Sequence, residues 1–133
     1  MAEHDEVRLT VPAMPEFLRL ARVTAAGLAS RMGFSLDEVE DLRLAIDELC
    51  FTLTGAHGRR GGTVAMRYRI GDGCLEVWGE GQFDSAHQPP KLGDLSEVIL
   101  TALVDEHEVS DPAGGSCFRL LKRLHGGGDR FVR

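Results

Sequence analysis

Aromatic and cysteine side chains are scarce in this sequence. Only 6% of its 133 residues are aromatic, and its three cysteines, Cys50, Cys74 and Cys117, show no paired spacing. The cysteine pattern argues against a disulfide framework and indicates a reducing compartment. No apolar run approaches the ~20 residues that span a bilayer, and the polar, acidic start of the chain is unlike a signal peptide. We therefore expect a cytoplasmic protein without a membrane partner.

Basic residues are also in the minority, with 15 Lys and Arg against 21 Asp and Glu and a net charge of −6. They are scattered, so no patch of them could neutralise a phosphate backbone, and we expect no direct contact with nucleic acid. Hydrophobic residues make up 43% of the chain and charged residues 27%, which is ordinary for a globular domain. A chain of this length forms one domain with a real core.

The motifs of the common catalytic sites are missing too. The chain has no glycine-rich loop that ends in Lys-Ser or Lys-Thr, and its five histidines lack metal-ligand spacing. No serine lies in a nucleophile elbow, and no cysteine has an activating neighbourhood. From these spacings alone, the one candidate for function is a segment without periodicity at 79–93, because long loops in compact domains are usually functional or mobile.

What is present is an alternation of short strands and amphipathic helices. Val7, Leu9 and Val11 alternate with polar residues, and the segment at 71–73 is typical of a hairpin turn. The predicted elements are a strand at 6–11, helices at 15–31 and 35–53, strands at 63–70 and 74–78, a helix at 95–103, and strands at 107–111 and 116–124.

This order of elements predicts an α+β fold. Strands that gather into hairpins, with helices between them, favour a two-layer sandwich in which a mostly antiparallel sheet is covered on one face by helices. We assign residues 6–124 to a single domain and residues 125–133 to a flexible C-terminal tail.

The stretch at 35–53 is the most informative one. Ser35 and Glu38 have the spacing of a capping box, and apolar residues recur after them at helical spacing. Glu48 precedes Thr52 by one turn, on the border between the apolar and the polar face of this helix. A carboxylate there is either a solvated helix charge or one that looks into a pocket at the sheet edge. The spacing alone favours the solvated position.

The same stretch resembles a known family. The segment LRLAIDELC at 42–50 is similar to the N box of the GHKL ATPase superfamily. The chain most resembles the RsbW-like branch, whose members are anti-sigma factors that double as serine protein kinases. The similarity runs from about Val7 to Leu124, and the segments at 104–109 and 114–124 resemble the end of that branch. The resemblance implies the Bergerat fold of these ATPases.

The resemblance also implies roles for two residues of the helix. In active members, a glutamate orients the attacking hydroxyl and an asparagine four residues later holds Mg²⁺. Glu48 matches the glutamate, so it is the catalytic candidate if kinase activity is retained. Thr52 stands at the asparagine position. Its hydroxyl could bind Mg²⁺, but it is shorter and lacks the amide oxygen.

The other nucleotide contacts of the family are altered. The aspartate that reads the adenine amino group is replaced by Gly79, in a segment that continues to Gly81. The glycines that cradle phosphates at the start of the next helix are replaced by Asp94 and Ser96. Asp94 adds a negative charge where a triphosphate would lie. We therefore expect degenerate nucleotide boxes and weak ATP binding or none.

Two functions from different classes follow from the resemblance. The first is a binding protein, an anti-sigma factor or partner-switch regulator that binds a sigma factor or its antagonist without a cofactor. The second is an enzyme, a serine protein kinase that phosphorylates the antagonist with Mg-ATP. Glu48 and Ser116 favour the enzyme, because Gly114-Gly115-Ser116 is similar to the family's closing Gly-Gly-Thr. The altered boxes favour the binding protein, which we prefer. Another regulatory partner stays open, because fold does not determine function.

Two surfaces are candidates for protein contacts. Arg19, Arg22 and Arg31 lie away from the apolar stripe of the first helix. Because arginines are favoured interface anchors, Arg19 and Arg22 are the candidate partner contacts. The alternative is that they form a solvated surface. The stripe consists of Phe17, Leu18, Ala21, Ala25 and Leu28. Members of the branch are typically dimers, which implies a homodimer here, and the strand at 6–11 could pair across a two-fold axis.

Overall fold

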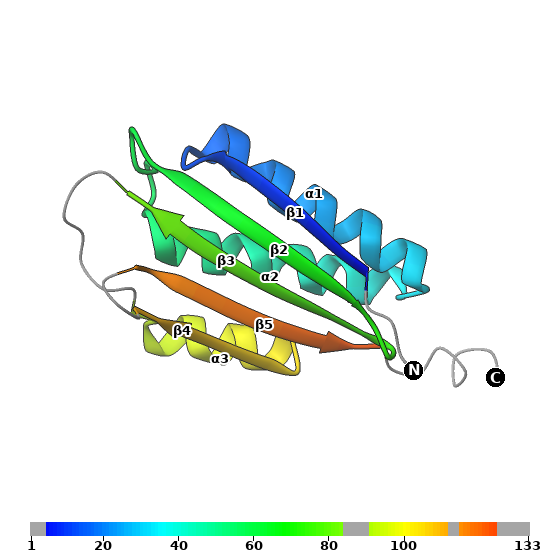
Figure 1. Ribbon diagram of the computed structural model, residues 1–133. Helices are drawn as coiled ribbons and strands as arrows, with labels where there is room; N and C mark the ends of the chain where they lie inside the picture. Colours follow the sequence, from blue (N-terminus) through cyan, green and yellow to red (C-terminus); the bar gives the residue numbers. More distant parts are fainter. Residues whose placement is uncertain (1–4, 84–90, 112–114, 125–133) are drawn as a thin grey trace, which may run out of the picture.

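The computed structural model describes residues 5–83, 91–111 and 115–124. The elements are arranged in two layers, one of strands and one of helices (Figure 1). In chain order they are β1 Asp5–Pro12, α1 Pro15–Met32, α2 Leu36–Thr54, β2 Thr63–Gly71, β3 Cys74–Gln82, α3 Asp94–Leu103, β4 Glu106–Ser110 and β5 Cys117–Arg123. The predicted order of strands and helices is confirmed, and the predicted tail at 125–133 lies outside the described residues.

The strands form one sheet in the order β1-β2-β3-β5-β4, and every neighbouring pair is antiparallel. All three helices lie on the same side of this sheet (Figure 1). The predicted α+β sandwich is therefore confirmed. β1 lies at one edge of the sheet, as its candidate role in pairing requires. In the described part of the chain, no helix is long and apolar enough to cross a membrane.

The core lies between the helices and the sheet. α2 contributes Leu42, Ile46 and Leu49, each fully buried. Its start is fixed by a capping box, in which the Glu38 amide donates to Ser35 Oγ and the Ser35 amide donates to the Glu38 carboxylate. The predicted capping box is confirmed.

α1 packs closely on the sheet through small side chains. Ala21, Ala25 and Ala29 are fully buried, so the backbone of the helix can approach the strands. The Tyr68 hydroxyl of β2 uses this approach and donates to the carbonyl oxygen of Ala21 at 2.8 Å. Phe17, predicted to belong to the buried stripe, is 41% exposed, because the buried face of α1 is rotated toward its alanines.

β3 is longer than predicted. It was expected to end at residue 78, but Gly79 to Gln82 continue the ladder and pair with Thr63 to Met66. The predicted loop at 79–93 is therefore wrong over its first four residues, and residues 84–90 lie outside the described part. Two glycines without side chains removed the alternation by which a strand is recognised.

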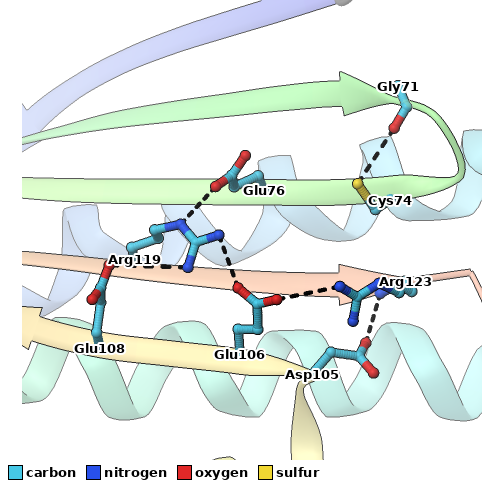
Figure 2. Close-up of polar contacts among 8 residues, drawn as sticks. All are labelled: Gly71, Cys74, Glu76, Asp105, Glu106, Glu108, Arg119 and Arg123. Atoms are coloured by element: carbon cyan, nitrogen blue, oxygen red, sulfur yellow. Dashed lines mark hydrogen bonds and ion pairs between the residues drawn. The ribbon is translucent and has the colours of Figure 1, made fainter.

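The face of the sheet opposite the helices carries charged side chains that pair across the strands. Arg119 of β5 is at its centre (Figure 2): it donates to Glu76 at 2.6 Å and to Glu106 at 3.0 Å. The hydrogen bond from Arg119 lowers the pKa of Glu106 below its ordinary value. Arg123 donates to the other oxygen of Glu106 at 3.2 Å. Such pairs allow this face to meet water without a second layer of helices.

The hydrogen bond between Tyr68 and Ala21 leads to the first prediction. We expect Tyr68→Phe to lower the free energy of unfolding by ~1 kcal/mol, because it leaves the packing in place and removes one buried hydrogen bond. Urea denaturation measures the change. An unchanged midpoint would show that this bond does not stabilise the contact between α1 and β2.

Candidate functional site

Glu48 lies at the contact between α2 and α3. Its side chain is half-buried, and its carboxylate accepts a hydrogen bond from the hydroxyl of Ser96. The fully solvated position that the spacing favours is therefore wrong, because the carboxylate is turned toward α3. The alternative, a carboxylate that looks into a pocket at the sheet edge, stays a prediction. Glu48 and Ser96 are 48 residues apart in the chain, and α3 brings them together. A carboxylate that holds a hydroxyl has the arrangement of a general base with its proton donor.

Thr52 lies one turn after Glu48 on the same helix, as the spacing predicts. Its hydroxyl donates to the backbone carbonyl oxygen of Glu48 at 2.9 Å, which is a contact within the helix. Within residues 5–83, 91–111 and 115–124, no group of three or more His, Cys, Asp or Glu side chains could hold a metal ion. The proposed metal role of Thr52 therefore has no support from a ligand cluster around it.

The start of α3 is acidic. Gly93 occupies the N-cap position and has no side chain with which to cap the helix, and Asp94 and Glu97 lie in the first turn. Negative charges there stabilise the helix through its dipole. They also repel a phosphate group, because an anion and these carboxylates would compete for the same amide groups.

Gly79 faces the helical side of the sheet, and the ring of Phe118 covers it. Gly79 in β3 and Phe118 in β5 are direct partners across the ladder. A Cβ atom at position 79 would lie 2.3 Å from Cε2 and 2.5 Å from Cζ of that ring. Real side chains do not approach so closely, so a residue with a side chain at position 79 requires Phe118 to move. Phe118 is only 2% exposed and belongs to the core.

Gly81 is covered in the same way by Phe83. A Cβ atom at position 81 would lie 2.4 Å from Cζ of the Phe83 ring. The guanidinium of Arg59, from the loop before β2, lies 4.5 Å from the centre of the same ring. This is within the range of a cation–π contact, which holds the ring in place.

Ser116 lies beside these glycines with its hydroxyl buried. The amide of Gly81 donates to the carbonyl oxygen of Ser116 at 2.8 Å, which joins the ends of β3 and β5. The Ser116 side chain is buried, at 1% exposure. Its Oγ has no hydrogen-bond partner in the part of the chain that the structure describes. Gly115, which precedes Ser116 in the segment similar to the family's closing Gly-Gly-Thr, is half-buried. A buried hydroxyl without a partner is rare and fits a missing ligand atom.

Arg19 and Arg22 line a separate hollow of about 160 Å³ between α1 and the end of α2. Arg19 is exposed, whereas Arg22 donates to the carboxylate of Asp47 at 2.8 Å. Cys50 also lines this hollow, and burial raises the pKa of its thiol to about 12. Burial therefore favours the protonated form of this thiol at neutral pH.

A larger hollow, about 490 Å³, lies on the uncovered face of the sheet. Its lining includes Arg67 and Trp78, and the guanidinium of Arg67 lies 4.0 Å from the Trp78 ring centre. It is not the candidate site, because Glu48 and Ser96 belong to helices on the other side of the sheet.

The structure thus divides the predicted residues into three groups. Glu48 and Ser96 meet at α2 and α3, Gly79, Gly81 and Ser116 meet at the ends of β3 and β5, and the two arginines lie beside α2. Sequence reasoning missed Phe118, Phe83 and Asp47. A large aromatic residue near a glycine of an adjacent strand is a signal for the two rings, but it requires the strand register, which the sequence does not specify.

Comparison with known proteins finds a matching family and similar proteins in two Bacillus species. The family model described as the histidine kinase-like ATPase domain matches residues 11–122. The serine-protein kinase RsbW of Bacillus subtilis (strain 168) is 35% identical over 105 residues, which cover 77% of this chain and 65% of that protein. The serine-protein kinase RsbW of Bacillus pumilus (strain SAFR-032) is 33% identical over 132 residues, covering 83% of this chain and 81% of that protein.

A solved structure has a similar fold. The crystal structure of the RsbU and RsbW domains of Rv1364c from Mycobacterium tuberculosis matches with a TM-score of 0.66 and 19% identity. The match covers 90% of this chain and 32% of that chain. The chain therefore spans about two thirds of the Bacillus subtilis relative and a smaller part of the mycobacterial protein, and at this identity the structural match concerns the fold alone.

The residues present do not fit Mg-ATP, the ligand that the family implies. The unpaired Ser116 hydroxyl would suit a ligand atom. Against this, the space over Gly79 is filled by Phe118, and Asp94 adds a negative charge in the first turn of α3. A side chain or ligand atom placed directly over Gly79 would require the ring of Phe118 to move.

The unpaired hydroxyl leads to the second prediction. We expect Ser116→Ala to leave the free energy of unfolding unchanged or to raise it by up to ~1 kcal/mol, because it removes a buried polar atom without a partner. Urea denaturation measures the change, and Tyr68→Phe, which removes a paired hydroxyl, is the control. A loss as large as that of Tyr68→Phe would show that the Ser116 hydroxyl has a partner after all.

Proposed function

Because the chain belongs to the histidine kinase-like ATPase family, in its RsbW-like branch, we propose that it is a partner-switch regulator of the anti-sigma type. It binds a sigma factor or the antagonist of an anti-sigma factor through protein–protein contacts in the cytoplasm. Nucleotide binds weakly or not at all, so the contacts do not depend on a cofactor. We further propose that the regulator is a homodimer paired along the exposed edge of β1.

The observation that carries this proposal is the ring of Phe118 over Gly79. In the family, the residue at position 79 is the carboxylate that reads adenine, and here both the carboxylate and the space for it are absent. A kinase that had lost only the carboxylate would retain an empty pocket. A buried ring in that space supports a scaffold that folds and acts without nucleotide.

The alternative is an active serine protein kinase that phosphorylates the antagonist. The contact between Ser96 and Glu48 favours it, because a carboxylate that accepts from one hydroxyl could accept from the hydroxyl of a substrate serine. Glu48 would then orient the hydroxyl and take its proton. ATP would supply the phosphoryl group. The residues around Gly79 and Asp94 do not favour this function.

The face of α1 next to α2 is the candidate partner surface. Arg19 is exposed there, and Arg22 keeps its Nε buried without a partner in the described part of the chain although its other end binds Asp47. Phe51 of α2 is 54% exposed and lines the same hollow. An exposed aromatic ring and two arginines around one hollow have the composition of an interface anchor and suit an acidic partner segment.

The third prediction concerns nucleotide. In isothermal titration calorimetry, Mg-ATP and Mg-ADP should bind with dissociation constants no tighter than ~1 mM, which corresponds to about 4 kcal/mol of binding free energy. The reason is that the adenine position is filled and Asp94 repels the phosphates. Micromolar binding, or transfer of phosphate to a co-purified protein, would favour the kinase.

The fourth prediction concerns the partner. The protein, used as bait in an extract of its host without added nucleotide, should retain a sigma factor or an antagonist. Arg19→Glu should reduce that retention at least about tenfold, since reversal of a charge at an interface anchor costs more than 1.4 kcal/mol. Arg31→Glu is the matched control, because Arg31 is also exposed on α1 but lies about 18 Å further along the helix. A partner retained only with ATP would contradict the proposal.

A further inference from the structure

We infer that this chain fills its own nucleotide pocket with two of its own aromatic rings. Phe118 lies over Gly79, the position at which the resemblance implies the adenine-reading aspartate, and Phe83 lies over Gly81. The inference rests on the proposed function and deepens it. The low affinity for nucleotide comes from occupied space, in addition to the contacts that the chain has lost.

The register of the sheet fixes the first ring. β3 and β5 pair so that Gly79 is opposite Phe118 and Val77 is opposite Leu120. The ring of Phe118 leans across its partner strand and takes the volume that a side chain at position 79 would need, with three of its atoms within 3.0 Å of the missing Cβ. Because Phe118 is 2% exposed, the ring is part of the packed core. A ligand base that entered here would have to displace it.

The second ring is held from two sides. Phe83 contacts the position of a Cβ at Gly81 at 2.4 Å and that of a Cβ at Gly62 at 2.6 Å, so it fits against one glycine of β3 and one that directly precedes β2. The guanidinium of Arg59 also lies over this ring, 4.5 Å from its centre. A ring that packs between two glycines and a guanidinium has one favoured position, and that position covers the end of β3.

At the polar end of the same site, the carboxylate of Glu48 is also occupied by a side chain of the protein itself. The hydroxyl of Ser96 binds the carboxylate of Glu48, the residue that orients a hydroxyl in active members of the family. Ser116, whose hydroxyl has no partner among the described residues, is the exception. It lies two residues before Phe118 in sequence and is joined to Gly81 by a backbone hydrogen bond, so it borders the filled space.

This inference differs in its consequences from a simple loss of contacts. If the contacts alone were missing, restoring a carboxylate by Gly79→Asp would improve binding. If Phe118 occupies the space, Gly79→Asp alone creates a clash, and binding returns only when the ring is also shortened. The two explanations therefore predict opposite results for the same substitution.

The experiment compares four proteins by calorimetric titration with Mg-ATP: the parent, Gly79→Asp, Gly79→Asp with Phe118→Val, and Gly79→Asp with Leu120→Val. Leu120 is the matched control, because it is fully buried, faces the same side from the same strand and lies opposite Val77. Thermal unfolding of each protein is recorded beside the titrations.

We expect Gly79→Asp alone to lower the melting temperature without any gain in binding. Adding Phe118→Val should restore part of the melting temperature and tighten Mg-ATP binding at least about tenfold relative to the parent. Adding Leu120→Val should do neither, since it only creates a second cavity. Ser116→Ala, introduced into the binding variant, should weaken the affinity again, because its hydroxyl borders the opened space.

A folded double variant with Phe118→Val that binds Mg-ATP no better than the parent would overturn the inference. If the double variant does not fold, Phe118→Val alone is titrated, and it must bind better than the parent for the inference to stand. The proposed function fails separately. It fails if the parent protein binds its partner only with ATP, a result that the ring substitutions do not affect.

Discussion

The antiparallel register of β3 and β5 is the constraint on which the candidate site depends. It places Phe118 opposite Gly79, and it places the carbonyl oxygen of Ser116 where the amide of Gly81 can donate to it. A shift by one residue would turn every side chain of β5 to the other face of the sheet. Phe118 and Leu120 would then leave the core, and Arg119 would enter it. The charge pairs of Arg119 on the uncovered face and the aromatic ring over Gly79 therefore specify the same register from the two faces.

Much of the fold could be predicted from the sequence because its signals are local. The capping box at Ser35 and Glu38 begins α2, and the alternation of Val7, Leu9 and Val11 marks β1. The end of β3 could not be predicted in this way. Its last residues include two glycines, and their strand conformation depends on pairing with β2, which is a contact between distant parts of the chain.

The residues of the candidate site could be predicted from the sequence, but the contacts of their side chains could not. The resemblance located Glu48, Gly79 and Ser116, and the structure brings each of them to the helical side of the sheet. The resemblance could not show that Ser96 binds Glu48 or that Phe118 covers Gly79, because both contacts depend on side chains from elements far away in the chain. Glu48 is the instructive case. The helical spacing favours a solvated position for its carboxylate. Only the packing of α3 against α2 places Ser96 where its hydroxyl can donate to that carboxylate.

α2 connects the candidate nucleotide site at Glu48 with the proposed partner surface on α1. Asp47 and Glu48 are neighbours in sequence, and successive residues of a helix point about 100° apart. Asp47 accordingly binds Arg22 of α1, and Glu48 binds Ser96 of α3. A nucleotide can change the proposed partner surface on α1 only if it binds two arrangements of α2 with different affinities. Where the protein's own side chains occupy the nucleotide site, that difference in affinity is lost. A partner surface that is formed at all times is then the expected result, and a switch in such a protein has to come from competition between partners.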